Sequence, residues 1–235
     1  MDELRSSLSP SWDRYGPGRG RCGLVIDADR TLAAEDSGRL VGGVFGLNEE
    51  IRQIFETLGY VSGAFERVAG TWGRIPCGAY LGAAEAASRK VHVRDAWVDI
   101  LMAARDRRPV VVVSAGIPHV WRRALDHCGF QDIPVVGGCH PRVDNFLVFP
   151  RTKATLVDLL RGAGWRVLAA GDSPIDLPML QRADIPLFVP DAKGSPALRS
   201  LLGSVPAVRH LLVDERRFDQ LATMTPCQVV EMLAD

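Results

Sequence analysis

The sequence predicts an α/β protein with a doubly wound parallel sheet and a small helical domain inserted after the first strand. Short apolar runs rich in β-branched residues alternate with segments of helical periodicity, which is typical of right-handed βαβ units. The first of these runs ends abruptly in acidic residues, as expected of a strand buried on both faces of a parallel sheet. The segment from about Ala33 to Arg105 interrupts this alternation, because it looks helical and has no convincing strand.

Six segments are predicted to form the strands of the sheet. Gly23–Ile26 is a short apolar run, and Val110–Val113 consists of β-branched residues throughout, which favours a strand over a helix. The remaining candidates are Ile133–Val136, Arg166–Ala170, Ile185–Val189 and Val208–Val213. Open α/β sheets bind ligands at the carboxyl ends of their strands, so the residues that follow these segments are candidates for a functional site.

Helices are predicted between the strands from their start and stop signals. Pro118 at a first helical position and Gly129 just beyond the end bracket a helix over His119–Cys128. Thr152 can cap a helix that runs to about Arg161. The last two predicted helices begin at Ser-Pro or Thr-Pro pairs and cover Ser195–Gly203 and Thr225–Leu233.

The inserted segment is interpreted as a helical cap, which divides the chain into two domains. Apolar residues recur there at helical spacing, at Ile51, Ile54, Phe55 and Leu58. A second helix is predicted from the alanine-rich stretch Tyr80–Ser88. Residues 34–105 are therefore assigned to the cap, and residues 1–33 and 106–235 to a discontinuous core. Residues 1–20 are predicted to form a polar arm ahead of the first strand.

The composition indicates a soluble globular protein that acts on a small molecule. Lys plus Arg and Asp plus Glu number 28 each, so no net field would attract nucleic acid or an acidic membrane surface. The longest strongly apolar stretch, around Pro109–Val113, is far shorter than a membrane span. The composition does not indicate an oligomeric state.

The five cysteines indicate reduced thiols. They are scattered, odd in number and without the spacing of a zinc site, so neither a disulfide framework nor a structural zinc is predicted. The N-terminal segment also lacks the apolar core of a secretory signal. Together these features predict a cytoplasmic protein.

Two acidic clusters follow predicted strands. Asp27 and Asp29 are separated by one residue and leave the end of the first strand on the same side of the chain. Such a pair can hold a hard divalent cation, and one carboxylate can attack while the other handles the proton. Asp172 and Asp176 lie four residues apart after the strand Arg166–Ala170. Each cluster alone could equally be an acidic turn or a helix cap.

Two further segments are candidates for binding phosphate. Ser114, Ala115 and Gly116 follow the second strand at a helix start, where a hydroxyl and backbone N–H groups can cradle a phosphate. Lys153 lies near the start of another helix and could direct its ammonium group at the same phosphate. Neither segment is specific by itself, because serine and glycine are common where a strand turns into a helix.

Taken together and in this order, the four motifs resemble those of the haloacid dehalogenase superfamily. The nucleophile motif matches as DADRT, the serine motif as VVVVSAG, the lysine motif as Lys153 and the acidic motif as GDSPIDLPML. The resemblance extends from about Gly23 to Leu180. It implies a Rossmann-type core and a phosphatase that requires Mg²⁺ and forms an aspartyl-phosphate.

The resemblance also implies a role for each matching residue. Asp27 would be the nucleophile, and Asp29 would protonate the leaving alcohol and then activate water. The transferring phosphoryl group would be bound by Ser114, Ala115 and Lys153. Mg²⁺ would be bound by the side chains of Asp27 and Asp172 and by the backbone carbonyl of Asp29. Asp176 would support that metal site. These roles suit phosphoryl transfer, which depends mostly on positioning and charge neutralisation.

The inserted helical segment and the run DLPML also resemble the phosphoserine-phosphatase branch of this superfamily. Two departures argue against phosphoserine as the preferred substrate. Ile175 stands where that branch usually has Asn, and the stretch Tyr80–Ser88 lacks a counterpart of its cap arginine. A substrate carboxylate left unpaired in a dry site would be costly. Arg30, Arg67, Arg74 or Arg89 could supply the missing charge from another direction. With this alternative open, we expect a larger ester, such as a sugar, nucleoside or biosynthetic-intermediate phosphate.

Several alternatives stay open at this point. One is a phosphoserine phosphatase, and a second is a phosphotransferase or a hydrolase of another bond. A third is a non-catalytic ligand-binding protein on the same fold. A dehalogenase is not favoured, because the dehalogenases of this superfamily lack the acid at the position of Asp29. A nucleotide-binding module is not favoured either, because no glycine-rich loop follows the first strand.

Overall fold

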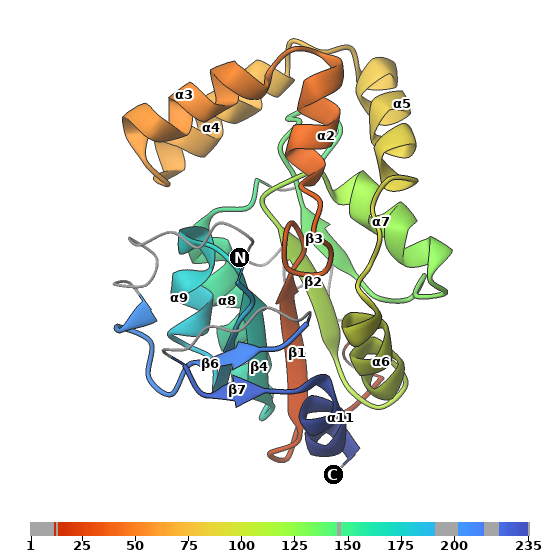
Figure 1. The fold of residues 1–235 in the computed structure, drawn as a ribbon, viewed down its shortest axis with the longest axis vertical. Helices are drawn as coiled ribbons and strands as arrows, with labels where there is room; N and C mark the ends of the chain where they lie inside the picture. The colour runs from red at the N-terminus through yellow and green to blue at the C-terminus, as the bar shows by residue number, and fades with distance from the viewer. Residues whose placement is uncertain (1–11, 13, 145–146, 191–201, 214–220, 235) are drawn as a thin grey trace.

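The computed structural model describes residue 12 and residues 14–144, 147–190, 202–213 and 221–234. Within these ranges, parallel strands form a single sheet in the order β3-β2-β1-β4-β5-β6-β7 (Figure 1). The strands are β1 Cys22–Asp27, β2 Val110–Ser114, β3 Val135–Gly137, β4 Arg166–Gly171, β5 Ile185–Phe188, β6 Arg209–Leu211 and β7 Thr223–Met224. The order runs outward from β1 in both directions, so the predicted doubly wound sheet is confirmed.

The structure differs from the predicted elements mainly at the edges of the sheet. β3 begins at Val135 instead of Ile133, and β6 is shorter than the predicted Val208–Val213. β7 was not predicted, because a strand of two residues gives no detectable alternation. The helix predicted over Ser195–Gly203 begins outside the described residues.

Both faces of the sheet are buried, and alternate residues of β1 point to opposite faces. Leu24 and Ile26 belong to one apolar cluster, whereas Val25 belongs to the other. The first face is covered by α6 (Asp95–Ala104), α7 (Pro118–His127) and α11 (Pro226–Ala234). The second is covered by α8 (Pro150–Gly162) and α9 (Leu177–Leu180). This burial on both sides explains why β1 and β2 are continuous apolar runs without polar alternation.

Four helices lie beyond the carboxyl ends of β1 and β2 and form the cap (Figure 1). They are α2 Ser37–Val44, α3 Asn48–Leu58, α4 Ser62–Trp72 and α5 Cys77–Ser88. Residues 34–94 contain no strand, in agreement with the helical segment that the sequence predicts. Inside the cap, the buried rings of Trp72 and Tyr80 meet edge to face, with centroids 5.8 Å apart.

The helix α6 packs with the core, although the sequence assignment placed it in the cap. It lies beside α11 and contributes Trp97, Ile100 and Leu101 to the cluster on the first face of the sheet. The chain re-enters the core at Arg94, whose backbone N–H donates to the carbonyl of Leu32 at 2.9 Å. We therefore propose that the cap ends near Arg94 instead of at residue 105.

The described part of the predicted N-terminal arm follows the core closely. The backbone N–H of Gly18 donates to the carbonyl of Ala163 at 3.0 Å, just beyond the end of α8. The Tyr15 ring meets Trp165 edge to face, with centroids 6.5 Å apart. These contacts fix the start of β1 against the adjoining α8–β4 turn.

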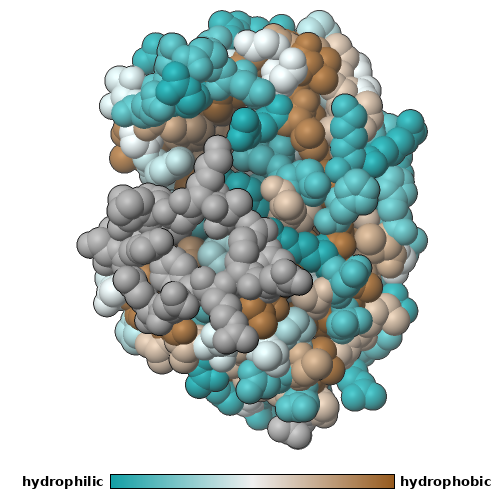
Figure 2. All heavy atoms as spheres, in the orientation of Figure 1, coloured by the Kyte–Doolittle hydropathy of each residue, from teal (hydrophilic) through white to brown (hydrophobic). Residues whose placement is uncertain are grey.

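Polar side chains dominate the outer side of the cap. On the face shown in Figure 2, hydrophilic residues cover much of α3, whose exposed residues outside the cavity include Gln53 and Thr57. Among the helices that the structure describes, none combines the length and apolar character needed to cross a membrane.

Candidate active site

The first acidic cluster lies at the carboxyl end of β1, the central strand of the sheet. Asp27 is the last residue of β1 and is 4% exposed. The chain then turns sharply, with the backbone N–H groups of Thr31 and Leu32 both donating to the carbonyl of Ala28. The strand order reverses at β1, and such a switch point is where open α/β sheets bind ligands.

Lys153 joins the two acidic clusters. Its Nζ donates to Oδ1 of Asp27 at 2.5 Å and to Oδ1 of Asp176 at 2.6 Å. The side chain lies in the first turn of α8 and is almost completely buried. Burial lowers the pKa of Lys153, but the charges of Asp176 and Asp27 outweigh this effect and raise it above its ordinary value. The lysine is therefore held as a cation against both carboxylates.

The second acidic cluster follows β4 and is closed by Asp176. This residue ends the short 3₁₀ helix η1 (Pro174–Asp176). Its Oδ2 accepts the backbone N–H groups of Asp172 and Ser173 and, at 2.7 Å, the Ser173 hydroxyl. A Cβ at Gly171 would lie 2.5 Å from the Asp176 side chain, so this loop requires glycine there. Asp176 thus closes its own loop and also orients Lys153.

The donors needed for a hard cation come together at this place. One carboxylate oxygen from each of Asp27, Asp172 and Asp176 lies within 4.8 Å of the others, and all three residues are buried. The pKa of Asp27 is raised to about 7, mainly by burial and to a smaller extent by the charge of Asp176. Burial likewise raises the pKa of Asp172, against the opposing charge of Arg30. Buried carboxylates in mutual repulsion fit Mg²⁺, which prefers oxygen ligands.

The side chain of Asp29 points away from this acidic group. Its Oδ2 accepts the Ser114 hydroxyl at 2.5 Å, and its Oδ1 accepts the backbone N–H of Ser37, the first residue of α2. Burial and the charge of Asp36 raise the pKa of Asp29. A carboxyl group that retains its proton more readily suits a general acid. Because its side chain is engaged in this way, Asp29 can contribute only its backbone carbonyl to the metal site.

The polar groups of the serine motif are divided between Asp29 and the cavity. The Ser114 hydroxyl is fully buried, contacts Asp29 and accepts the Gly116 N–H at 2.8 Å. Ala115 and Gly116, in contrast, line the cavity in front of Asp27. A Cβ at Gly116 would collide with the Asp29 carboxylate and the Ser37 hydroxyl. The backbone of this turn therefore lines the cavity, whereas the Ser114 side chain is hydrogen-bonded to Asp29.

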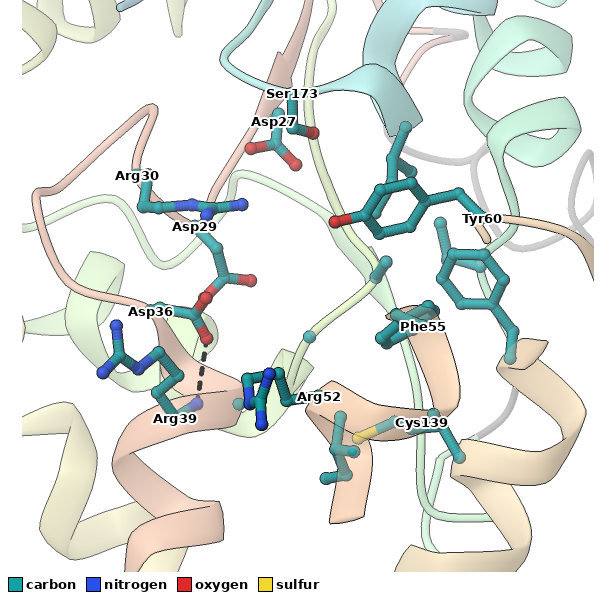
Figure 3. A pocket seen from close by; sticks show the side chains of 18 of the residues that line it. Asp27, Asp29, Arg30, Asp36, Arg39, Arg52, Phe55, Tyr60, Cys139 and Ser173 are labelled. Carbon is teal, nitrogen blue, oxygen red and sulfur yellow. Dashed lines mark hydrogen bonds between the residues drawn. The ribbon is translucent and has the colours of Figure 1, made fainter. Parts of the chain in front are cut away.

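A cavity of about 920 Å³ lies between the core and the cap. Its core side includes Asp27, Asp29, Lys153 and Asp172. Figure 3 shows the carboxylates of Asp27, at the end of β1, and of Asp29, in the turn that follows, facing this space. Each of the four motifs thus contributes at least one residue to one end of the cavity, as the convergence of parallel strand ends predicts, whereas Ser114 and Asp176 lie behind this lining.

The cap side of the cavity is formed by helices that sequence reasoning did not assign to it. Arg39 of α2 and Arg52 of α3 both line the cavity, whereas Tyr80–Ser88 contributes no lining residue. The helix α5 packs instead against α7 and α2. The stretch Tyr80–Ser88, in which the sequence analysis looked for a cap arginine, therefore does not face the cavity. The sequence contained a pattern that could have indicated the role of α3. Arg52 lies three residues before Phe55 and therefore on the same face of the helix.

Aromatic rings of the cap form one wall of the cavity, and behind this wall they contact a ring of the core. The Phe55 ring lies 5.2 Å from Tyr60 and 5.1 Å from Phe65, measured between centroids. Phe65 in turn meets Phe149, which precedes α8, at 5.7 Å. Tyr60 is 46% exposed, and Figure 3 shows its hydroxyl end directed into the cavity. This wall offers flat apolar surface with one polar group.

Comparisons with solved structures show the same fold in several hydrolases. Phosphoserine phosphatase from T. onnurineus is 20% identical, with 93% of this chain and 97% of that chain covered and a TM-score of 0.60. A HAD family hydrolase from Salmonella enterica serovar Typhi is 19% identical, covering 84% and 72%, with a TM-score of 0.58. Cytosolic 5′-nucleotidase IIIB bound to cytidine is 13% identical, covering 99% and 91%, with a TM-score of 0.59.

The family assignment comes from the sequence itself. No curated protein matches the chain. The model of the haloacid dehalogenase-like hydrolases, however, matches residues 24–181, which include all four motifs and the whole cap. This match confirms the resemblance that the motifs indicated. The chain belongs to the haloacid dehalogenase-like hydrolase family.

Proposed function

We propose that this chain is a Mg²⁺-dependent phosphatase that hydrolyses a small-molecule phosphate monoester through an aspartyl-phosphate on Asp27. The observation that carries the proposal is the position of Asp27. Its carboxylate faces the cavity, contacts the ammonium of Lys153 and lies within the buried acidic group. Family membership and the phosphatases that share the fold support the same assignment.

In this proposal each residue acts on a different part of the phosphate ester. Mg²⁺, held by Asp27, Asp172 and the Asp29 carbonyl, would supply positive charge for the phosphoryl oxygens. Asp27 attacks phosphorus, and Lys153 balances its charge. Asp29 donates a proton to the leaving oxygen, and its carboxylate then takes a proton from the water that hydrolyses the aspartyl-phosphate. Burial raises the pKa of Asp29, which suits the first of these two proton transfers.

The size and lining of the cavity favour a leaving group larger than serine. A volume of about 920 Å³ is at the upper end of ordinary small-molecule sites. The wall formed by Phe55, Tyr60 and Phe65 favours a leaving group that has a flat or apolar part. Sugar, nucleoside and biosynthetic-intermediate phosphates therefore remain the proposed substrates. The similar fold of a nucleotidase bound to cytidine supports the nucleoside class.

L-Phosphoserine is the second candidate, and one observation favours it. The sequence argued against it because a cap cation for its carboxylate was missing, yet Arg39 and Arg52 both line the cavity. Arg52 is already paired with Glu49 and Glu56. The guanidinium group of Arg39 has no partner among the described residues, so it is available to a second anionic group. The remaining arguments against phosphoserine are its small size and Ile175, which lines the cavity at a position where the phosphoserine-phosphatase branch usually has Asn.

A panel of phosphate monoesters tests both candidates. It contains p-nitrophenyl phosphate, L-phosphoserine, sugar phosphates and nucleoside monophosphates, with release of inorganic phosphate measured in Mg²⁺ and in EDTA. We expect turnover that requires Mg²⁺ and disappears in Asp27→Asn, because an amide is not a competent nucleophile. Full activity in EDTA, or in Asp27→Asn, would exclude the proposed mechanism. The highest kcat/KM on L-phosphoserine would select the second candidate.

A further inference from the structure

Arg30 has a backbone conformation that arginine rarely adopts. It directly follows Asp29, and its φ of 65° lies in the left-handed region that favours glycine. For a residue with a Cβ this conformation costs about 1–2 kcal/mol. The turn is held by a hydrogen bond from the Arg30 N–H to the carbonyl of Glu35 at 3.1 Å. Strained residues of this kind persist where the surrounding structure fixes them, and they cluster at active sites.

The strained turn directs the Arg30 side chain into the cavity beside the reacting carboxylates. Its Nε lies 3.1 Å from Oδ2 of Asp172, and 39% of the side chain is exposed. Figure 3 shows the guanidinium end pointing into the cavity on the side of Asp27 and Asp29. Among the residues that the structure describes, Asp172 is the only ion-pair partner of Arg30. The other N–H groups of the guanidinium fork therefore remain available to a ligand.

The other donors near Asp27 are already largely engaged. Lys153 has three N–H bonds and directs two of them to Asp27 and Asp176. The hydroxyl of Ser114 is bonded to Asp29 and does not line the cavity. A phosphoryl group has three non-bridging oxygens, and the developing charge on each needs a donor or a cation. Among the described residues at this end of the cavity, Arg30 is therefore the cation that still has several N–H groups available to a ligand.

We infer that Arg30 is a catalytic phosphate-binding residue, whose guanidinium fork binds non-bridging oxygens of the substrate phosphoryl group. This inference rests on the proposed function, because it names a further residue of the same site. The planar fork matches two phosphate oxygens at once, which a lysine ammonium at the same position cannot do. The gain in phosphate binding accounts for a strained arginine at a position whose backbone favours glycine.

The test uses Arg30→Gly and Arg30→Lys in the full-length chain. Arg30→Gly relieves the backbone, which offsets the loss of the ion pair with Asp172, so we expect its Tm in saturating Mg²⁺ to stay close to that of the wild type. We expect its kcat/KM on the best substrate to fall about 10- to 150-fold, the range of a hydrogen bond to a charged group. Its Kd for inorganic phosphate, measured by calorimetry in saturating Mg²⁺, should rise in parallel. Arg30→Lys should recover only part of each loss.

Arg19→Gly is the matched control. Arg19 is also a non-glycine residue with positive φ, 48°, but it lies in the arm and does not line the cavity. We expect this variant to keep wild-type kcat/KM and phosphate affinity. The inference is overturned if Arg30→Gly retains both quantities at saturating Mg²⁺. It is also overturned if the variant only needs more Mg²⁺ for half-activation, because Arg30 would then merely position Asp172.

The same measurements separate this inference from the proposed function. If the wild type hydrolyses no ester but binds inorganic phosphate through Arg30, the proposed function fails and with it the catalytic role of Arg30, while its phosphate-binding role stands. If the wild type is an active phosphatase and Arg30→Gly is equally active, the inference alone fails. A wild-type chain that neither hydrolyses esters nor binds phosphate overturns both.

Discussion

Asp27 and Asp29 are two residues apart in sequence, yet they lie in different chemical surroundings. Asp27 contacts the ammonium of Lys153 and belongs to the buried acidic group. Asp29 accepts the Ser114 hydroxyl and the first N–H of α2 instead. Two carboxylates in different environments can take different roles, with one as the nucleophile and the other as the acid. This division depends on how each side chain turns after β1.

The first prediction concerns the leaving group. Asp29→Asn should slow hydrolysis of an alkyl phosphate by about 10²- to 10⁴-fold, because a poorly leaving alcohol needs general-acid assistance. Hydrolysis of p-nitrophenyl phosphate should slow much less, since its leaving group needs little help. The measurement is steady-state kcat/KM for both esters in saturating Mg²⁺. Equal slowing of the two esters would contradict the role of Asp29 as the acid.

Gly116→Ala provides an independent variant for the same role. Its Cβ would collide with the Asp29 carboxylate and the Ser37 hydroxyl, so the acid would be displaced although its carboxyl group is retained. We expect the same dependence on the leaving group as in Asp29→Asn. Asp29→Asn removes the proton donor, whereas Gly116→Ala only moves it. Comparing the two variants therefore shows whether the position of the donor matters in addition to its presence.

At the scale of elements, the cap helices divide their tasks. The N-terminus of α2 donates its first N–H to Asp29, and Ser37 also accepts the backbone N–H of Ile117 at 3.0 Å. The start of α2 therefore connects the cap to the catalytic core. In contrast, α3 and α4 place rings over the cavity, and α5 packs against α7 and α2. The cap side of the cavity therefore consists of residues from α2, α3, α4 and the turn between α3 and α4.

The second prediction tests the aromatic wall. Phe55→Ala should raise KM for esters whose leaving group carries a ring, because it removes one face of the wall. We expect kcat/KM for these esters to fall by about tenfold, and that for glycerol phosphate to change little. Leu58→Ala is the matched control, since Leu58 lies on the same helix, is 40% exposed and does not line the cavity. The same loss on both kinds of ester would contradict a contact with the ring.

At the scale of the whole molecule, the sheet places several buried carboxylates at one end, at a cost to stability. Burial and the charge of Asp176 raise the pKa of Asp27 to about 7, whereas an unfolded aspartate titrates near 4. Between these two pH values the metal-free folded protein holds a proton that the unfolded chain does not. The stability that this proton contributes is present below about pH 4 and is lost as the pH rises through about 7.

The third prediction follows from this loss of stability with rising pH. In EDTA, the Tm of the wild type should fall between pH 6 and pH 8, and Mg²⁺ at pH 8 should restore it by binding the folded state. Asp27→Asn should lose activity but show a higher Tm than the wild type in EDTA at pH 8. Thermal unfolding followed by circular dichroism measures these differences. A Tm of Asp27→Asn below that of the wild type under these conditions would contradict the prediction.

Much of this molecule could be predicted from local patterns. The strands β1 and β2 can be predicted from their apolar runs, because both faces of each strand are buried and the residues before the final polar one are apolar. The acidic clusters are readable because they follow such strands directly. In contrast, β7 has two residues and no pattern, and α6 has a helical pattern that does not reveal which domain it packs against.

The sequence by itself determined the doubly wound sheet, the helical cap and the residues that meet at the strand ends. These features depend on short-range patterns and on the rule that parallel strands end at a common edge. Only the tertiary structure decided that α3 and α4, and not α5, form the wall of the cavity. It also decided that Ser114 contacts Asp29 while Arg30 points into the cavity. Such contacts depend on how helices pack and on which way side chains turn, and the spacing of residues along the chain carries neither.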